Sequence, residues 1–200
     1  VLGIVVEPVG ERSGVVLSEA FLTALAALRA ESGVPIALVE TASAYHRSGR
    51  GPFASSGSAL VPDAIAWWTG GQLGVVHVGS KLFVSTPHAL AGPWDGDELS
   101  LVIAQHQLRA TRRLDLTPAI AALDDALGPA VSAGLEVRGL GLHRVIVAGA
   151  RGEALAEALA ARGVFVALHP DGHVAIVPAL DRAEREAPRL RDALCAALDG

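Results

Sequence analysis

The sequence predicts an α/β fold in which helices cover a sheet. Short runs rich in β-branched residues alternate along the chain with longer segments of helical periodicity. In addition, 51% of the 200 residues are hydrophobic, so the chain can bury a substantial core. Each apolar run is far shorter than the roughly 20 residues that a membrane-spanning helix needs, which indicates a soluble protein.

Strand and helix signals alternate through the first half of the chain. Residues 3–7 predict a strand, and residues 18–32 predict a helix that begins at the cap residue Ser18 and ends at Gly33. Residues 41–62 hold many glycines, prolines and serines, which indicates a loop of functional length. Further strands are predicted over residues 35–40, 63–68 and 75–79.

The second half begins with a long helical pattern over residues 98–127, which breaks near 114–118 where Pro118 can start a new helix. Residues 135–149 predict either a pair of strands or one long bent strand. The remaining elements are a helix over 153–162, a strand over 164–169, a tight turn at 170–172, a strand over 173–178 and an amphipathic helix over 181–198.

Composition excludes some classes of partner and indicates a compartment. The net charge of −5 and the scattered arginines give no basic stripe, which argues against nucleic acid as a partner. The lone cysteine, Cys195, has no second cysteine for an internal disulfide, which favours a reducing compartment. The first residues already predict a strand and show no secretory leader, so we expect a cytoplasmic protein.

Several short motifs recur in the order and spacing of a known enzyme family. In that order the chain resembles the carboxy-terminal half of class III aminotransferases, which are pyridoxal-phosphate enzymes of fold type I. It is most similar to lysine 6-aminotransferases, because its Gly92–Gly96 segment resembles the Trp-Gly-Gly stretch of the lysine-specific members. The motifs are Val5-Val6-Glu7-Pro8-Val9 with Gly14-Val15, Tyr45-His46-Arg47-Ser48-Gly49, Pro62-Asp63 and Gly92-Pro93-Trp94-Asp95-Gly96.

The resemblance implies a domain organisation. Residues 1–97 would form a remnant of the large domain, residues 98–128 connecting helices, and residues 129–200 a small α+β domain. The family's large domain holds a mostly parallel seven-stranded sheet, of which about four strands are expected here. The half that carries the family's glycine-rich phosphate loop is expected to be missing.

The resemblance also places five functional residues of the family on side chains that cannot do the same chemistry. The aspartate that keeps the cofactor's ring nitrogen protonated falls on Val39, and a nearby glutamine falls on Ala42. The lysine that forms the Schiff base falls on Thr69, which cannot form an imine. The phosphate-binding threonine falls on Pro93, and the arginine that holds the substrate carboxylate falls on Ala175.

These losses predict a protein that does not use pyridoxal phosphate by itself. The single lysine, Lys81, lies about a dozen residues from the Schiff-base position and is expected on the surface. We therefore expect a non-catalytic subunit that completes or stabilises a catalytic aminotransferase-like partner, with the cofactor supplied only through that partner. The exposed edge of a partial sheet favours pairing with such a chain or with a second copy.

Two alternatives use the vacated cofactor pocket without pyridoxal phosphate. One is a repurposed enzyme with an acid or base from His46, His88 or Glu40, supported by Thr69. The other is a small-ligand binding module in the same pocket.

Two further residue patterns are weighed as ligand sites. His169 and His173 flank a predicted turn, but two ligands without a third at a recognisable spacing do not predict a metal site. Trp67 and Trp68 are adjacent on a predicted strand and must point to opposite faces. At most one of these two tryptophans therefore faces a pocket.

Overall fold

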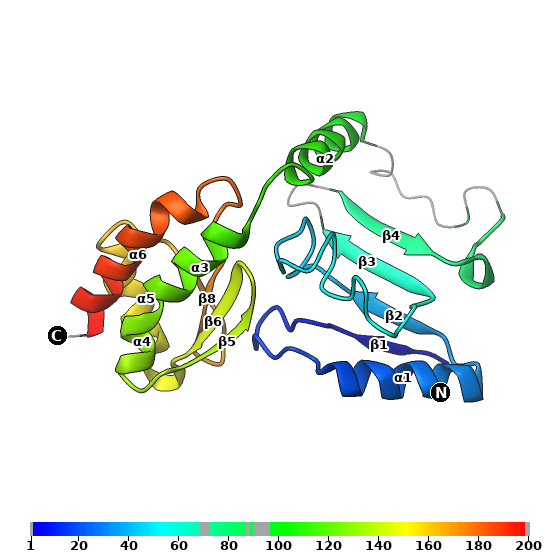
Figure 1. Ribbon diagram of the computed structural model, residues 1–200, viewed down its shortest axis with the longest axis horizontal. Coiled ribbons are helices and arrows are strands. Elements are labelled where there is room, and N and C mark those ends of the chain that lie inside the picture. Colours follow the sequence, from blue (N-terminus) through cyan, green and yellow to red (C-terminus); the bar gives the residue numbers. More distant parts are fainter. Residues whose placement is uncertain (1, 69–72, 87–88, 90–96, 199–200) are drawn as a thin grey trace.

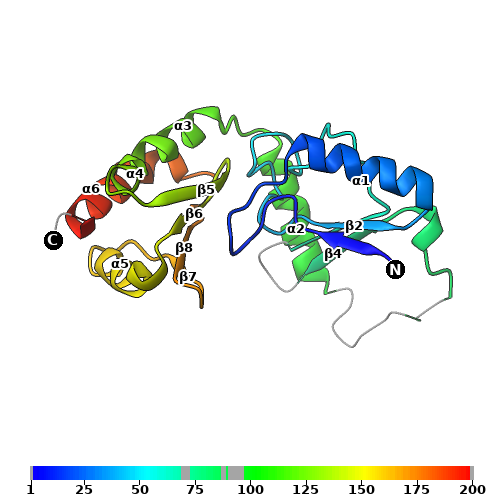
Figure 2. The same ribbon diagram turned by 90° about the horizontal axis from the view of Figure 1, so that it is seen from below.

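The computed structural model describes residues 2–68, 73–86, 89 and 97–198. Figures 1 and 2 show two lobes, which we call the N-terminal lobe and the C-terminal lobe, each built on its own four-stranded sheet. The predicted α/β class is confirmed. Within the described segments, no helix combines the length and the apolar character that crossing a bilayer requires.

The N-terminal lobe holds a mixed sheet in the order β1-β2-β3-β4. The first three strands are parallel, and β4 pairs with β3 in antiparallel register. The strands agree closely with those predicted. The elements are β1 (Ile4–Val6), α1 (Glu19–Ser32), β2 (Ile36–Val39), β3 (Ala64–Trp68), β4 (Gly74–Val78) and the short 3-10 helix η1 (Ser80–Leu82).

Helix α1 covers one face of this sheet. The Ser18 hydroxyl accepts a hydrogen bond from the Phe21 backbone nitrogen, and Gly33 ends the helix with a left-handed φ of 68°, as the sequence predicts. The apolar stripe of α1 buries Leu22 and Leu25 against β2. This packing forms the small core of the lobe: Leu22, Leu25, Ile36, Leu38 and Leu60.

A partly buried ion pair ties α1 to the sheet. The Arg29 guanidinium donates two hydrogen bonds of 2.7 Å to the Asp63 carboxylate, which also accepts one of 2.9 Å from the Ile36 backbone nitrogen. These bonds hold the pKa of Asp63 well below its usual range. The aspartate of the Pro62-Asp63 motif thus links the helix, β2 and the start of β3.

The C-terminal lobe holds an antiparallel sheet in the order β5-β6-β8-β7. Helices α3 to α6 cover one face and form the largest core of the protein, centred on Leu123, Leu159 and Leu194. The elements after β4 are α2 (Glu98–Thr111), α3 (Thr117–Ala126), α4 (Gly128–Ser132), β5 (Glu136–Leu140), β6 (His143–Val147), η2 (Gly149–Arg151), α5 (Gly152–Ala160), β7 (Ala167–Leu168), β8 (His173–Ile176) and α6 (Ala183–Leu198).

Two sequence predictions are refined in this lobe. The extended segment 135–149 is a pair of strands, β5 and β6, joined by a tight turn. The strand predicted over 164–169 is paired only at Ala167 and Leu168. Residues 164–166 instead separate from the sheet and line a cavity, in which Phe165 remains 86% exposed.

Candidate functional site

Glu40 organises the loop that follows β2. Its side chain is fully buried, and its carboxylate accepts hydrogen bonds from the Ser43 hydroxyl and from the backbone nitrogens of Ala54 and Ser55, the last two at 2.9 and 3.0 Å. Residues 41–56 fold around this carboxylate, which replaces the regular hydrogen-bond ladder of a strand or helix. All three bonds serve the loop's own structure, so Glu40 is the structural centre of the predicted loop.

Arg47 connects the two lobes. Its Nη1 donates to the carbonyl oxygens of Pro178 at 2.8 Å and Leu142 at 3.3 Å. Its own carbonyl accepts a 2.8 Å bond from the Leu142 nitrogen. Burial lowers the pKa of Arg47 to about 10. The arginine of the predicted Tyr45–Gly49 motif therefore lies in the interface between the lobes.

A second contact between the lobes comes from the segment that follows β1. The His143 Nε2 lies 3.0 Å from the Glu11 carbonyl oxygen. A side chain added at Gly14, where φ is +66°, would meet Val145 Cβ at 2.8 Å, so the segment packs closely on β6. The motif Glu7–Val15 thus contacts the sheet face of the C-terminal lobe that its helices leave uncovered.

We expect the free energy of unfolding to fall below neutral pH because of His143. Its side chain is 3% exposed, and burial lowers its pKa. The unfolded chain binds a proton at this residue below its ordinary pKa of about 6.5, whereas the folded chain resists it, so stability is lost as the pH falls. Urea unfolding at pH 7.5 and 5.5 should show that His143→Gln loses less stability on acidification than the unmodified protein.

The matched control is His106→Gln, on the exposed surface of α2. This variant should lose as much stability on acidification as the unmodified protein. If His143→Gln shows the same loss as His106→Gln, the buried imidazole does not carry the pH dependence.

The residues that the resemblance assigns to the cofactor are placed as follows. Val39 is half-buried on β2, Ala42 is buried in the loop core beside Val9, and Ala175 is buried in the middle of β8. Thr69 and Pro93 lie outside the described residues.

The candidate acids and bases do not meet at one point in the described part of the chain. Glu40 is enclosed by its own loop, whereas His46 lines a cavity of about 410 Å³ together with Asp115 and Thr117. His46 has a left-handed φ of 64°, which is uncommon for a residue with a side chain. His88 lies outside the described residues. Lys81 is exposed on η1.

The two adjacent tryptophans point to opposite faces, as the sequence predicts. Trp67 is buried in an aromatic cluster, with the His77 ring stacked 6.1 Å away and the Tyr45 ring edge-on at 5.1 Å. Trp68 is 48% exposed and lines a cavity between the lobes.

That cavity, which we call the interlobe cavity, has a volume of about 540 Å³. Two of its lining side chains are bonded to each other: the Tyr45 hydroxyl donates a hydrogen bond of 3.1 Å to the Gln107 side-chain oxygen. The sequence singled out the Tyr45–Gly49 loop but offered no sign of the cavity, because its wall also needs the segment after β8. The lining residues are Thr41, Ala44, Tyr45, Arg47, Trp68, Gln107, Ala110, Thr111, Leu114, Val177, Leu180 and Asp181.

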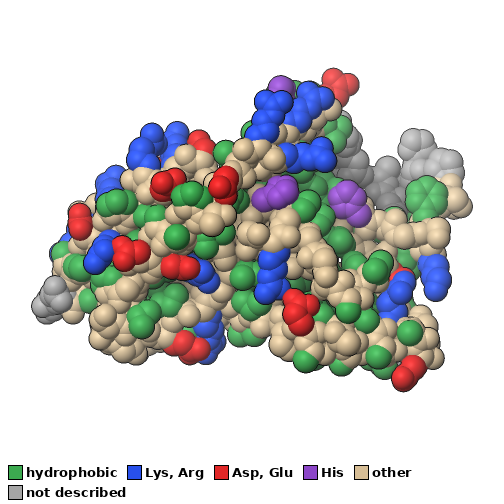
Figure 3. Space-filling view, viewed as in Figure 1, with side chains coloured by type: hydrophobic (Ala, Val, Ile, Leu, Met, Phe, Trp, Pro, Cys, Tyr) green, Lys and Arg blue, Asp and Glu red, His purple; other side chains and the backbone are tan. Residues whose placement is uncertain are grey.

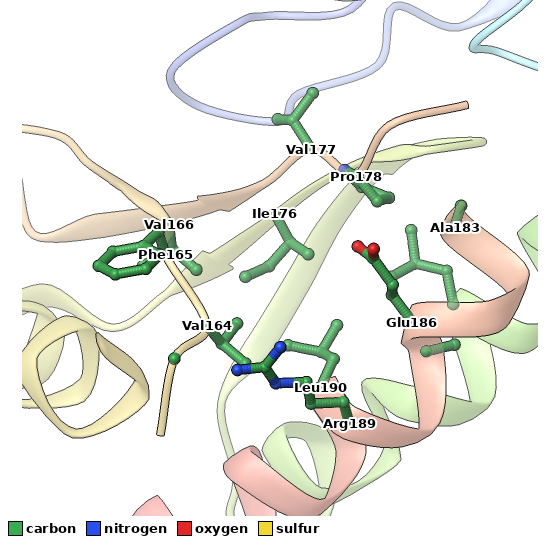
Figure 4. Close-up of a pocket in the computed structure, with 13 residues that line it drawn as sticks. Val164, Phe165, Val166, Ile176, Val177, Pro178, Ala183, Glu186, Arg189 and Leu190 are labelled. Atoms are coloured by element: carbon green, nitrogen blue, oxygen red, sulfur yellow. The ribbon is translucent and has the colours of Figure 1, made fainter. Parts of the chain in front are cut away.

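A smaller cavity of about 260 Å³ lies within the C-terminal lobe, between residues 163–166, β8 and α6. Its floor is apolar, and Glu186 and Arg189 extend from α6 beside Ile176 and Val164 (Figure 4). Arg189 donates to the Arg162 carbonyl oxygen at 3.3 Å. Among the described residues, none of those predicted to carry function lines this cavity.

The described residues bring together no three histidine, cysteine or acidic side chains that could hold a metal ion. His169 and His173 flank their turn as expected, and the His173 Nδ1 lies 2.9 Å from the Asp171 carboxylate. His173 therefore contacts an acid of its own turn.

The fold is similar to that of solved aminotransferases. An ornithine aminotransferase from Plasmodium yoelii matches 98% of this chain with a TM-score of 0.83 and 17% identity, over 57% of its own length. An (S)-enantioselective omega-transaminase from Thermomicrobium roseum matches 98% with a TM-score of 0.83 and 22% identity, over 50% of its length. An N-acetylornithine aminotransferase from Stenotrophomonas maltophilia matches 97% with a TM-score of 0.74 and 24% identity, over 56% of its length.

The chain thus spans about half the length of the solved chains that it matches. No protein-family model and no curated protein sequence matches it. The predicted fold is confirmed: a partial sheet of aminotransferase fold type I followed by a smaller α+β lobe.

Proposed function

We propose that this chain is an aminotransferase-like pseudoenzyme, related to the carboxy-terminal half of lysine 6-aminotransferases, that acts as a non-catalytic subunit. In this proposal it completes or stabilises a catalytic aminotransferase-like partner, or pairs with a second copy of itself. Because it has one cysteine, we place it in the cytoplasm. Pyridoxal phosphate enters its function only through the partner.

The observation that carries the proposal is an aminotransferase fold with inert side chains at the positions that the resemblance assigns to the cofactor and substrate. Val39 offers no carboxylate for the ring nitrogen of pyridoxal phosphate, and Ala175 offers no guanidinium for a substrate carboxylate. Glu40, the acid next to Val39, is fully buried and engaged by three donors of its own loop. The side chains at these positions support the proposal that the chain does not hold the cofactor by itself.

An uncovered apolar surface supports the pairing. Helix α2 buries only Ala104 and Thr111 and leaves its larger apolar side chains on the outside. In the same lobe, β4 and the residues after η1 also expose apolar side chains, and Figure 3 shows basic side chains gathered over α2. A surface of this kind is typical of a protein interface. The exposed residues are Leu99, Leu101, Val102, Ile103 and Leu108 on α2, Val76 and Val78 on β4, and Phe83 and Val84 after η1.

We expect Val102→Glu to weaken association at least tenfold, because it places a charge in the centre of the exposed apolar surface of α2. The native mass of the purified chain, alone and co-expressed with the product of a neighbouring gene, measures the effect. A mass of two identical chains indicates self-pairing, and a mixed mass indicates a partner subunit. A monomer under both conditions contradicts the proposal.

Val131→Glu is the matched control for this experiment. Val131 lies on α4 in the other lobe and is 58% exposed, compared with 51% for Val102, so both changes add the same charge to an exposed helical valine. Association should be unchanged in Val131→Glu. Equal weakening by both variants indicates a general effect of charge and argues against α2 as the interface.

A second candidate function, binding of a small ligand, is favoured by the interlobe cavity. The cavity is large enough for a small organic molecule, and it has both aromatic and charged side chains in its wall. The charged and aromatic side chains in its wall indicate which class of ligand the cavity can bind.

A further inference from the structure

The guanidinium of Arg47 carries a largely buried charge that has no acidic partner. Its Nη1 donates to two backbone carbonyls, and no ion pair of the described residues includes it. Burial is the cause that lowers its pKa to about 10. A buried cation without an anion is costly, so the site favours an anionic ligand that reaches it.

The remaining donors of Arg47 are available to such a ligand. Within the described part of the chain, the Nε and Nη2 of Arg47 make no hydrogen bond. Both atoms also keep some exposed surface, since neither is a fully enclosed polar atom that lacks a partner. Arg47 lines the interlobe cavity, so these N–H groups are accessible there. Two neighbouring guanidinium donors match the two oxygens of a carboxylate.

The rest of the wall suits an apolar body. The Trp68 indole is about half exposed, and Leu114, Val177 and Leu180 line the same cavity. The polar Tyr45 and Gln107 side chains bond to each other across the wall at 3.1 Å. The volume of about 540 Å³ lies in the range of small-molecule sites.

A second charge in the wall limits the ligand further. Asp181 lines the interlobe cavity from the segment that precedes α6. Its carboxylate repels a second negative group on the ligand, so it disfavours dicarboxylates and phosphates. We propose that the interlobe cavity binds a small monocarboxylate with an aromatic or branched apolar body, its carboxylate on Arg47 and its body against Trp68.

Of the five positions that the resemblance assigns to the cofactor and substrate, three can be compared with this cavity, and Thr69 and Pro93 lie outside the described residues. Val39, Ala42 and Ala175 do not line the interlobe cavity. The inference rests on the second candidate function, binding of a small ligand, and names the ligand class; it does not depend on a partner chain. It is tested on the purified protein alone, so its failure leaves the pairing proposal standing.

Isothermal titration calorimetry with 4-phenylbutyrate tests the inference. We expect a dissociation constant below about 1 mM, in keeping with the contacts that a ligand of this size makes. The neutral amide 4-phenylbutanamide should bind at least tenfold more weakly, because it loses the charge-assisted bonds to Arg47. No binding of 4-phenylbutyrate, equal binding of the amide, or tighter binding of the dicarboxylate glutarate overturns the inference.

Three variants distinguish a loss of ligand binding from a loss of folding. Arg47→Lys should weaken 4-phenylbutyrate binding at least tenfold, whereas Arg50→Lys, in the same loop but paired with Glu19, should leave it unchanged. Because Arg47 also joins the lobes, Ala110→Trp provides a test that keeps this arginine. The tryptophan can occupy part of the interlobe cavity and should weaken binding, and unchanged binding in a folded Ala110→Trp variant contradicts the site.

Asp181→Asn should strengthen 4-phenylbutyrate binding, whereas Arg47→Lys and Ala110→Trp should weaken it. It removes the negative charge from the cavity wall and should tighten 4-phenylbutyrate binding two- to fivefold at low salt. Asp181 is exposed, so the fold should tolerate the change. Weaker binding in this variant contradicts the placement of the carboxylate.

Discussion

Replacing Glu40 with alanine is expected to lower the free energy of unfolding by about 4 kcal/mol. The substitution leaves the backbone nitrogens of Ala54 and Ser55 and the Ser43 hydroxyl without their acceptor in a buried loop. Each buried donor without a partner costs about 1–3 kcal/mol. Urea unfolding followed by circular dichroism measures the loss.

Glu157→Ala is the matched control, because Glu157 is exposed on α5 and its side chain has no role in a loop. This control should change stability by less than about 0.5 kcal/mol. Hydrogen exchange adds a local measurement: in Glu40→Ala the amides of residues 41–56 should lose protection, and those of α5 should not. A stable Glu40→Ala variant with a protected loop contradicts a structural role for this carboxylate.

Replacing Gly141 with alanine is expected to cost about 4 kcal/mol and to loosen the contact between the lobes. Gly141 has a left-handed φ of +60°, and an added Cβ would lie 2.1 Å from the Arg47 carbonyl oxygen. Backbone atoms cannot yield as a flexible side chain does, so the Arg47 loop must move. Limited proteolysis and urea unfolding should both detect the change.

Gly134→Ala separates the clash from backbone strain. Gly134 also has a positive φ, +76°, but a Cβ there meets no atom within 4 Å. We expect a cost of about 1 kcal/mol for this control, which arises from the left-handed conformation alone. Equal costs for the two variants contradict a tight contact between Gly141 and the Arg47 loop.

The sequence could predict the elements because their signals are local. Ser18 and Gly33 mark the two ends of α1, and the hydrophobic periodicity between them indicates its buried stripe. Strands β1, β2 and β4 follow from short β-branched runs and β3 from Ile65 with two tryptophans, and the opposite faces of Trp67 and Trp68 follow from strand geometry. The order of motifs also led to the aminotransferase fold, which the solved structures confirm.

The site could be predicted only in part, because its contacts join distant residues. The Glu40 carboxylate is engaged by nitrogens 14 and 15 residues away, and Arg47 bonds to a carbonyl 131 residues away. No spacing in the sequence indicates such pairs. On the sequence alone Glu40 was a candidate catalytic acid. In the structure its carboxylate is buried and bonded to its own loop, so its role is structural. The interlobe cavity needs both lobes in place before its wall exists.

Reductive trapping tests most directly whether this aminotransferase fold lacks cofactor chemistry of its own. The purified chain is incubated with pyridoxal phosphate, reduced with borohydride, and examined by intact mass and peptide mapping. We predict neither an internal-aldimine absorption band nor a stoichiometric adduct when pyridoxal phosphate is equimolar with the chain, because the resemblance places Thr69, which cannot form an imine, at the Schiff-base position and the single lysine, Lys81, lies about a dozen residues away. A stoichiometric adduct at Lys81 together with the absorption band would contradict this prediction.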